Sequence, residues 1–220
     1  MSDTEKKPIS FWNVPNILTF ARIFLSIALF VVVPLELYAL SLILFSVGAL
    51  TDFFDGWWAR KFQQVTKFGR IADPFADKLL ICGTLIFLVA IQELRVPSAC
   101  LGGVNVGIAP WMVVVIVSRE LLITQLRSLI EAGGGNFSAK MAGKLKMGFQ
   151  CTAVIACFLY LITLRYVGIC PFLDKFLLPF FKWGMVAFLW GTVYLTLDSC
   201  VKYVIAAIRF SRTGGKESGS

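Results

Sequence analysis

The sequence predicts an all-α integral membrane protein with six transmembrane helices and a short N-terminal interfacial segment. Hydrophobic residues make up 58% of the 220 residues, the mean hydropathy is +0.79, and only 15% of the residues are charged. Soluble domains are far less apolar. The apolar runs are long and continuous rather than alternating, which favours helices over barrel strands. Because one span takes about 20 residues, a chain of this length holds about six.

The apolar runs place these spans in one membrane domain, residues 17–208. The expected spans are 17–33, 37–58, 75–94, 107–130, 145–168 and 177–208. Residues 1–16 come before them, and Phe11 and Trp12 among polar neighbours indicate contact with the membrane interface. The small polar residues of 209–220 predict a disordered tail.

Basic residues predict the orientation of the spans. An even number of spans puts both termini on one side, and most lysines and arginines near the helix ends fall on that side. By the positive-inside rule this side faces the cytoplasm, and we expect a bacterial inner membrane. The net charge of +8 favours anionic lipid. It does not indicate nucleic acid, because no nucleic-acid-binding motif accompanies it.

Metal-binding chemistry is limited by the residue types available. Histidine is absent, and the six cysteines show no C-x-x-C pair. We therefore expect the cysteines to be small buried hydrophobic residues and any metal to be held by oxygen.

Four aspartates stand out in this apolar chain. Asp52 and Asp55 share a helix face at the end of the second span, and Asp73 and Asp77 share one on the third. Pro74 is typical of a first helical turn, which would make Asp73 an N-cap. Ionised carboxylates this close together at membrane depth need a compensating cation. Four carboxylates suit two ions of Mg²⁺, Mn²⁺ or Ca²⁺.

The residues between the two aspartate pairs suit a nucleotide. Gly56 and Gly69 permit close approach of the backbone, and Arg60 offers a guanidinium to a phosphate or a base. With divalent ions these features indicate a nucleotide diphosphate site. For any one of the aspartates taken alone, a solvated helix cap is the alternative.

The complete motif resembles that of a known family. It reads Asp52-x2-Asp55-Gly56-x2-Ala59-Arg60-x8-Gly69-x3-Asp73-x3-Asp77. This pattern resembles the signature of the CDP-alcohol phosphotransferases at all eight fixed positions, and the six-span layout resembles that family too. The resemblance implies that the hydroxyl of an acceptor alcohol attacks the β-phosphorus of a CDP-linked donor and that CMP leaves. It also implies a homodimer.

The resemblance implies a role for each motif residue. The aspartates matching Asp52, Asp55 and Asp73 bind two divalent cations, Mg²⁺ or Mn²⁺, and the one matching Asp77 is the base, perhaps also a metal ligand. The CMP pocket is formed by residues that match Asp55, Gly56, Ala59, Arg60 and Gly69. From the first helix, Asn16, Thr19 and Arg22 are candidates to bind the nucleotide or lipid phosphates. Contacts with neighbouring helices are the alternative for these three.

Three other stretches bear on the acceptor. VPNILTFARI at 14–23, SRELLITQLRSL at 118–129 and GKLKMGFQ at 143–150 resemble bacterial phosphatidylglycerophosphate synthases, which join CDP-diacylglycerol to sn-glycerol 3-phosphate. Residues 147–150 depart from the usual pattern of those enzymes.

Basic residues in two of these stretches suit an acceptor that carries a phosphate. They are Arg119, Arg127, Lys144 and Lys146. Contact with lipid headgroups is the alternative for Arg127 and the two lysines. Arg119 followed by Glu120 inside an apolar span is typical of residues that face a cavity.

Other functions are compatible with the sequence. A cardiolipin synthase or a phosphatidylinositol phosphate synthase of the same family would use another acceptor. An ion-coupled transporter would also place acids in the membrane, but the chain shows no internal repeat. A scaffold without catalysis would be expected to have lost part of the signature, and all eight residues are present.

Overall fold

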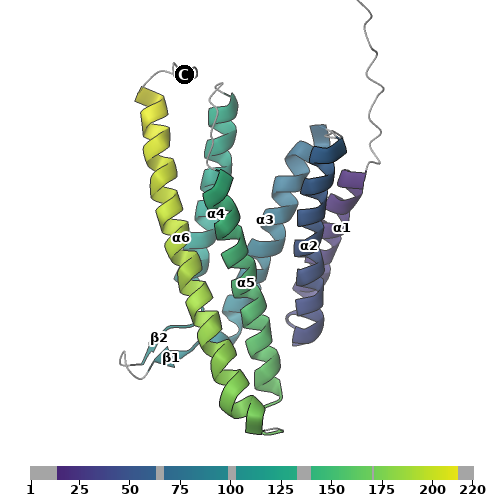
Figure 1. Ribbon diagram of the computed structural model, residues 1–220, viewed down its shortest axis with the longest axis vertical. Coiled ribbons are helices and arrows are strands. Elements are labelled where there is room, and N and C mark those ends of the chain that lie inside the picture. Colours follow the sequence, from purple (N-terminus) through teal and green to yellow (C-terminus); the bar gives the residue numbers. More distant parts are fainter. Residues whose placement is uncertain (1–13, 63–66, 99–102, 133–139, 170, 213–220) are drawn as a thin grey trace, which may run out of the picture. The chain divides into compact units, whose positions relative to one another are not determined.

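A computed structural model describes residues 14–62, 67–98, 103–132, 140–169 and 171–212, and for some helical residues it describes the backbone alone. The long elements in these ranges are helices (Figure 1). They are α1 Val14–Val32, α2 Tyr38–Phe62, α3 Lys67–Ala90, α4 Pro110–Ala132, α5 Lys140–Arg165 and α6 Leu178–Arg212. Each overlaps one predicted span, so the prediction that the long elements are helices is confirmed for the described residues.

Several helix ends differ from the prediction by a few residues, and the start of α3 differs most. α3 begins at Lys67, so Asp73 and Pro74 lie inside the helix and the predicted N-cap at Asp73 is wrong. The polar residues that open α3 continue the helix beyond the apolar run, and hydropathy marks membrane depth rather than helix ends. Because proline has no N–H, Pro74 removes one backbone hydrogen bond from α3. α6 continues to Arg212, past the expected end at residue 208.

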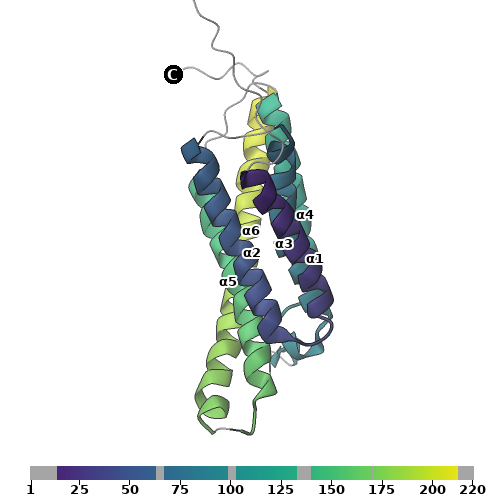
Figure 2. The same ribbon diagram turned by 90° about the vertical axis from the view of Figure 1, so that its right-hand side faces the viewer.

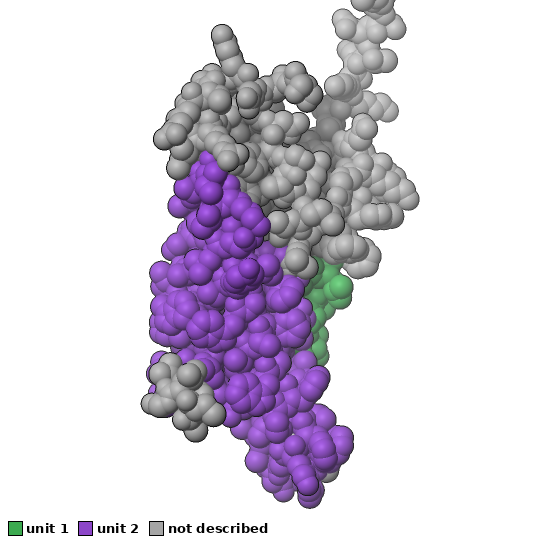
Figure 3. Space-filling view, turned by 60° about the vertical axis from the view of Figure 1, so that its left-hand side comes forward, with its two compact units in different colours: residues 1–84 green, residues 85–220 purple. Residues whose placement is uncertain are grey.

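The chain falls into two units, residues 1–84 and 85–220 (Figure 3). In the first unit α1 packs along α2, and Leu29, Phe45 and Leu80 from the three helices are fully buried. In the second unit α6 packs against both α5 and α4, and α5 and α6 run side by side (Figures 1 and 2).

A short hairpin precedes α4 in the second unit. The 3₁₀ helix η1, Gln92–Leu94, leads into β1, Pro97–Ser98, which pairs antiparallel with β2, Val104–Asn105. The Asn105 side chain accepts hydrogen bonds from the backbone N–H of Val96 at 2.9 Å and of Gly107 at 3.0 Å. The Trp190 indole of α6 donates to the Val106 carbonyl at 3.0 Å. The hairpin is thereby attached to α6.

Features of the described helices are those of a membrane protein. Two stretches, Lys146–Arg165 and Asp174–Lys202, are long and apolar enough to cross a membrane, and the latter includes the π-helical turn η3, Leu173–Leu177. Shorter apolar helices occupy 17–32, 38–51 and 78–90. The six-span layout stays a prediction.

α6 shows the distribution of side chains expected in lipid. Its buried face carries Thr192, Thr196 and Ser199, whereas its exposed side chains include Tyr194 and Val201. Polar groups inside and large apolar groups outside are the reverse of a soluble protein. This arrangement supports the assignment to a membrane.

Gly107 is required by the hairpin. A Cβ atom at this position would overlap the Leu94 carbonyl oxygen and lie 2.8 Å from the Val96 nitrogen, and both are backbone atoms that cannot turn away. We therefore expect Gly107→Ala to lower the free energy of unfolding by about 1–3 kcal/mol. Thermal unfolding in detergent measures this. Gly184→Ala is the control, because nothing lies within 4 Å of its added Cβ; equal stability of the two variants would contradict the prediction.

Candidate functional site

A close approach of α2 and α3 lies beside the aspartate motif. Gly48 of α2 is buried, and a Cβ atom there would lie 2.8 Å from Leu80 Cδ2 of α3. Leu80 itself is buried. The glycine therefore allows the two helices to meet at this point, one turn from the aspartates.

Helix geometry relates this contact to all four aspartate positions. At about 100° per residue, Asp52 and Asp55 lie on the same face of α2 as Gly48. Asp73 and Asp77 lie on the same face of α3 as Leu80 by the same rule. By helical phase, the aspartate positions therefore share the helix faces that carry Gly48 and Leu80.

Three lysines near the motif occupy other helix faces, whereas Arg70 of α3 lies about 20° around the helix from Asp77. Lys61 of α2 is about 140° around the helix from Gly48, and Lys67 and Lys78 of α3 are about 140–160° from Leu80. The side of each helix that carries the aspartate positions is therefore not the side that carries these lysines.

The other motif residues fall on the same two helices. Gly56, Ala59 and Arg60 belong to α2, and Gly69 belongs to α3. The side chains of the eight motif residues lie outside the described ones, so their contacts stay predictions. Among the side chains that are described, no three His, Cys, Asp or Glu residues form a metal-binding group.

α1 carries a buried polar face. Thr19, Arg22 and Ser26 follow helical spacing and are each at most 1% exposed. The Ser26 hydroxyl donates to the Arg22 carbonyl at 2.8 Å. Asn16 lies in the first turn of α1, and its side chain is outside the described residues. The polar face fits the predicted binding role and also fits a contact between helices.

The strongest group of charges in the second unit joins three helices. Arg119 and Glu120 of α4 and Lys146 of α5 are 8%, 5% and 2% exposed. The Glu120 carboxylate lies 3.3 Å from Arg119 Nη1 and is also paired with Lys146 Nζ. Arg119 Nη2 donates to the hydroxyl of Ser199 on α6. We call Arg119, Glu120, Lys146 and Ser199 the Glu120 cluster.

The Glu120 cluster contains two of the four residues predicted to bind the phosphate of the acceptor. It brings Arg119 and Lys146 to one carboxylate, although 26 residues separate Lys146 from Glu120 in the chain. Arg127 and Lys144 lie on α4 and α5, and their side chains are outside the described ones. Sequence reasoning singled out Glu120 only as the neighbour of Arg119 and missed Ser199, because a serine inside a long apolar helix gives no signal of its own.

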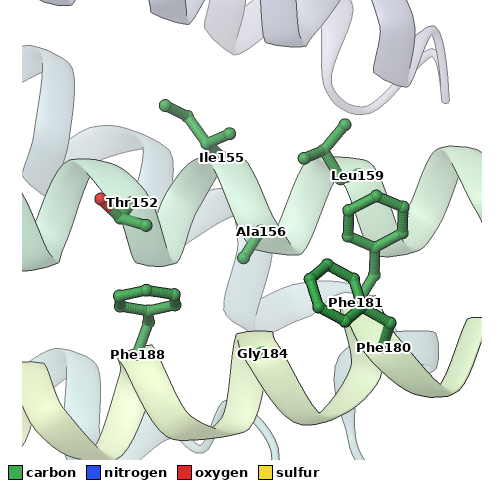
Figure 4. Close-up of a pocket in the computed structure, with 8 residues that line it drawn as sticks. All are labelled: Thr152, Ile155, Ala156, Leu159, Phe180, Phe181, Gly184 and Phe188. Atoms are coloured by element: carbon green, nitrogen blue, oxygen red, sulfur yellow. The ribbon is translucent and has the colours of Figure 1, made fainter. Parts of the chain in front are cut away.

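An apolar cavity separates α5 from α6 further along the helices. It has a volume of about 150 Å³, and Figure 4 shows Phe188 opposite Thr152, with Phe180 and Phe181 beside Leu159. The Thr152 hydroxyl already donates to the Gly148 carbonyl at 2.8 Å. Such a lining offers nothing to a phosphate or a cation, so the polar chemistry belongs elsewhere.

The fold is that of a helical protein with apolar helices of the membrane type, and its aspartate motif falls on α2 and α3. The profile of the CDP-alcohol phosphatidyltransferase family matches residues 12–197. The chain belongs to this family.

Several bacterial enzymes are similar to this chain, and all carry the name CDP-diacylglycerol–glycerol-3-phosphate 3-phosphatidyltransferase. The enzyme of Bacillus subtilis is 34% identical over 87% of this chain and 93% of its own length. That of Salmonella paratyphi A is 30% identical over 81% of this chain and 93% of its own. That of Rickettsia typhi is 35% identical over 64% of this chain and 74% of its own.

The seam between α2 and α3 can be tested through Gly48. Gly48→Leu would force the helices apart beside the motif, and a displacement of about 1 Å can cost about 100-fold in rate. We expect a loss of CMP release of that order, measured with purified protein. Val47→Leu is the control, because Val47 is an adjacent exposed residue. Normal activity of Gly48→Leu would show that the seam does not position the motif.

Proposed function

We propose that this protein is a divalent-metal-dependent phosphatidyltransferase that moves the phosphatidyl group of CDP-diacylglycerol to sn-glycerol 3-phosphate. The products are CMP and phosphatidylglycerol phosphate, and the process belongs to phospholipid biosynthesis. The observation that supports this most is that all four aspartate positions share, by helical phase, the faces of α2 and α3 that carry Gly48 and Leu80. Relatives that match most of the chain carry the name of this reaction.

The reaction is a displacement at phosphorus. The acceptor hydroxyl oxygen forms a bond to the β-phosphorus of the donor, and the bond from that phosphorus to the bridging oxygen breaks. CMP leaves with the electron pair of the broken bond. Asp77 takes the proton of the hydroxyl, and because a carboxylate is a weak base, it also orients the nucleophile.

A carboxylate-only set of ligands on two adjoining helices fits Mg²⁺ or Mn²⁺. Asp52, Asp55, Asp73 and Asp77 would hold one or two such ions, which when bound neutralise charge on the pyrophosphate. Gly56, Ala59, Arg60 and Gly69 would form the CMP pocket with Asp55. Asn16 and Thr19 would add polar contacts to the nucleotide from α1.

The acceptor is distinguished by its phosphate. Arg119, Arg127, Lys144 and Lys146 offer four cationic groups, and guanidinium and ammonium groups bind phosphate through charge-assisted hydrogen bonds. A neutral alcohol such as inositol, or a cationic one such as choline, would gain nothing from this set.

We extend the proposal to the arrangement in the membrane. Six spans would place both termini and the aspartate motif on the cytoplasmic side of a bacterial inner membrane, in accord with the distribution of basic residues. The diacyl tails of the donor would stay in the bilayer. A homodimer is proposed from the family resemblance.

The proposed function is tested by finding which acceptor supports CMP release. Purified protein should release CMP from CDP-diacylglycerol with glycerol 3-phosphate, and a chelator should abolish the release. Inositol 1-phosphate, serine and phosphatidylglycerol serve as competing acceptors. Release with phosphatidylglycerol alone would indicate a cardiolipin synthase, and release with inositol 1-phosphate would indicate a phosphatidylinositol phosphate synthase. Ion flux in liposomes without CMP release would favour a transporter.

The base is tested separately from the metal ligands. Asp77→Asn should lower turnover by about 100-fold or more with little change in donor binding, because it removes the proton acceptor and retains the size of the side chain. Asp52→Asn should instead weaken donor binding and raise the metal concentration needed. Steady-state kinetics at several metal concentrations separate the two effects. Turnover of Asp77→Asn at the wild-type rate would refute its role as base.

A further inference from the structure

Glu120 has no role in the function proposed above, yet it is the residue around which the Glu120 cluster forms. It is a carboxylate 95% withdrawn from solvent on an apolar helix, and its charge is matched by Arg119 and Lys146. Ionised groups in such surroundings are rare and costly unless they are paired. A purely apolar contact would hold the helices together at least as well. Helix packing alone therefore does not explain why a charged residue occupies position 120.

The contacts show what Glu120 does to its neighbours. Arg119 and Glu120 are adjacent on α4, so their positions point about 100° apart. Arg119 nevertheless reaches back to the carboxylate with Nη1 and extends Nη2 to Ser199 of α6. Two different nitrogens of one guanidinium are thus held by two fixed groups, and the planar group has a defined orientation.

Lys146 is held by the same carboxylate from another helix. In the described chain α6 packs closely on α5 and on α4, whereas α4 and α5 have no comparable backbone packing with each other. The Glu120 to Lys146 pair is therefore a side-chain bridge between two helices that do not otherwise pack closely. Without it, the flexible lysine chain would lose a contact that fixes its ammonium group.

We propose that Glu120 is a positioning residue that fixes the Arg119 guanidinium and the Lys146 ammonium for the phosphate of the acceptor. The proposal rests on the function proposed above. A preorganised pair of cations binds an anion without first having to order two long side chains. In the absence of the carboxylate, the two cations would repel each other inside the bundle and at least one would move or lose its proton.

The test is Glu120→Gln, which removes the charge and keeps the size. We expect the KM for glycerol 3-phosphate to rise about 10-fold or more, as for the loss of a charge-assisted hydrogen bond, with the KM for CDP-diacylglycerol within about 2-fold of wild type. Glu120→Asp should restore part of the acceptor KM. Glu93→Gln is the matched control, because Glu93 is exposed in η1.

A second variant covers the case in which Glu120→Gln fails to fold. Ser199→Ala removes the hydrogen bond from Arg119 Nη2, and we expect a rise in the acceptor KM of about 3-fold with the donor KM unchanged. Thr196→Val is its control on the same buried face of α6.

The outcomes separate the two proposals. If wild-type protein releases no CMP with glycerol 3-phosphate, the proposed function fails, and the positioning role fails with it. If wild type is active and the acceptor KM is unchanged or lower in both Glu120→Gln and Ser199→Ala, only the positioning role is overturned. The same holds if both KM values and the melting temperature change together, because that pattern indicates packing alone.

Discussion

An apolar bundle must neutralise every ionised side chain that it contains, and this constraint organises the chemistry of the protein. Water is absent from the hydrocarbon core, so each charge needs a partner within hydrogen-bonding distance. In the second unit the chain supplies partners of its own: the Glu120 carboxylate pairs with both Arg119 and Lys146, and the Ser199 hydroxyl accepts a hydrogen bond from the guanidinium. The aspartate motif lies on helix faces that do not carry the nearby lysines, and a divalent cation as its partner is part of the proposed function.

Close packing at glycines fixes the positions of the helices in the first unit. In lipid the association of helices depends on van der Waals contact, and small residues let helices approach each other. Gly48 admits Leu80 at the seam of α2 and α3, and Gly83 admits the ring of Phe30 between α3 and α1. α3 is thus in contact with both other helices of the first unit through positions that cannot carry a side chain without movement. Because Asp73 and Asp77 are on this helix, its position determines where two of the four carboxylates lie.

The helices and the motif could be predicted from the sequence because both depend on short-range sequence patterns. Long apolar runs locate the helices to within several residues, and the eight signature residues fall on α2 and α3 as expected. The start of α3 could not be predicted, since its first two turns are polar and an apolar run was the only guide. The hairpin at residues 97–105 was missed because each strand has two residues.

Contacts between residues far apart along the chain could not be predicted from the sequence either. Nothing in the local pattern joins Lys146 to Glu120 or Ser199 to Arg119, because these pairs depend on how α4, α5 and α6 pack. The motif is common to a family that uses several acceptors, so it cannot by itself decide which acceptor is used. That decision has to depend on residues outside the motif. A cationic acceptor would be attracted by an available carboxylate, whereas in this chain the Glu120 carboxylate is paired with two cations. Under the proposed function, the cluster would offer the acceptor an excess of positive charge. The arrangement that satisfies the buried charges is therefore also one that favours an acceptor bearing a phosphate.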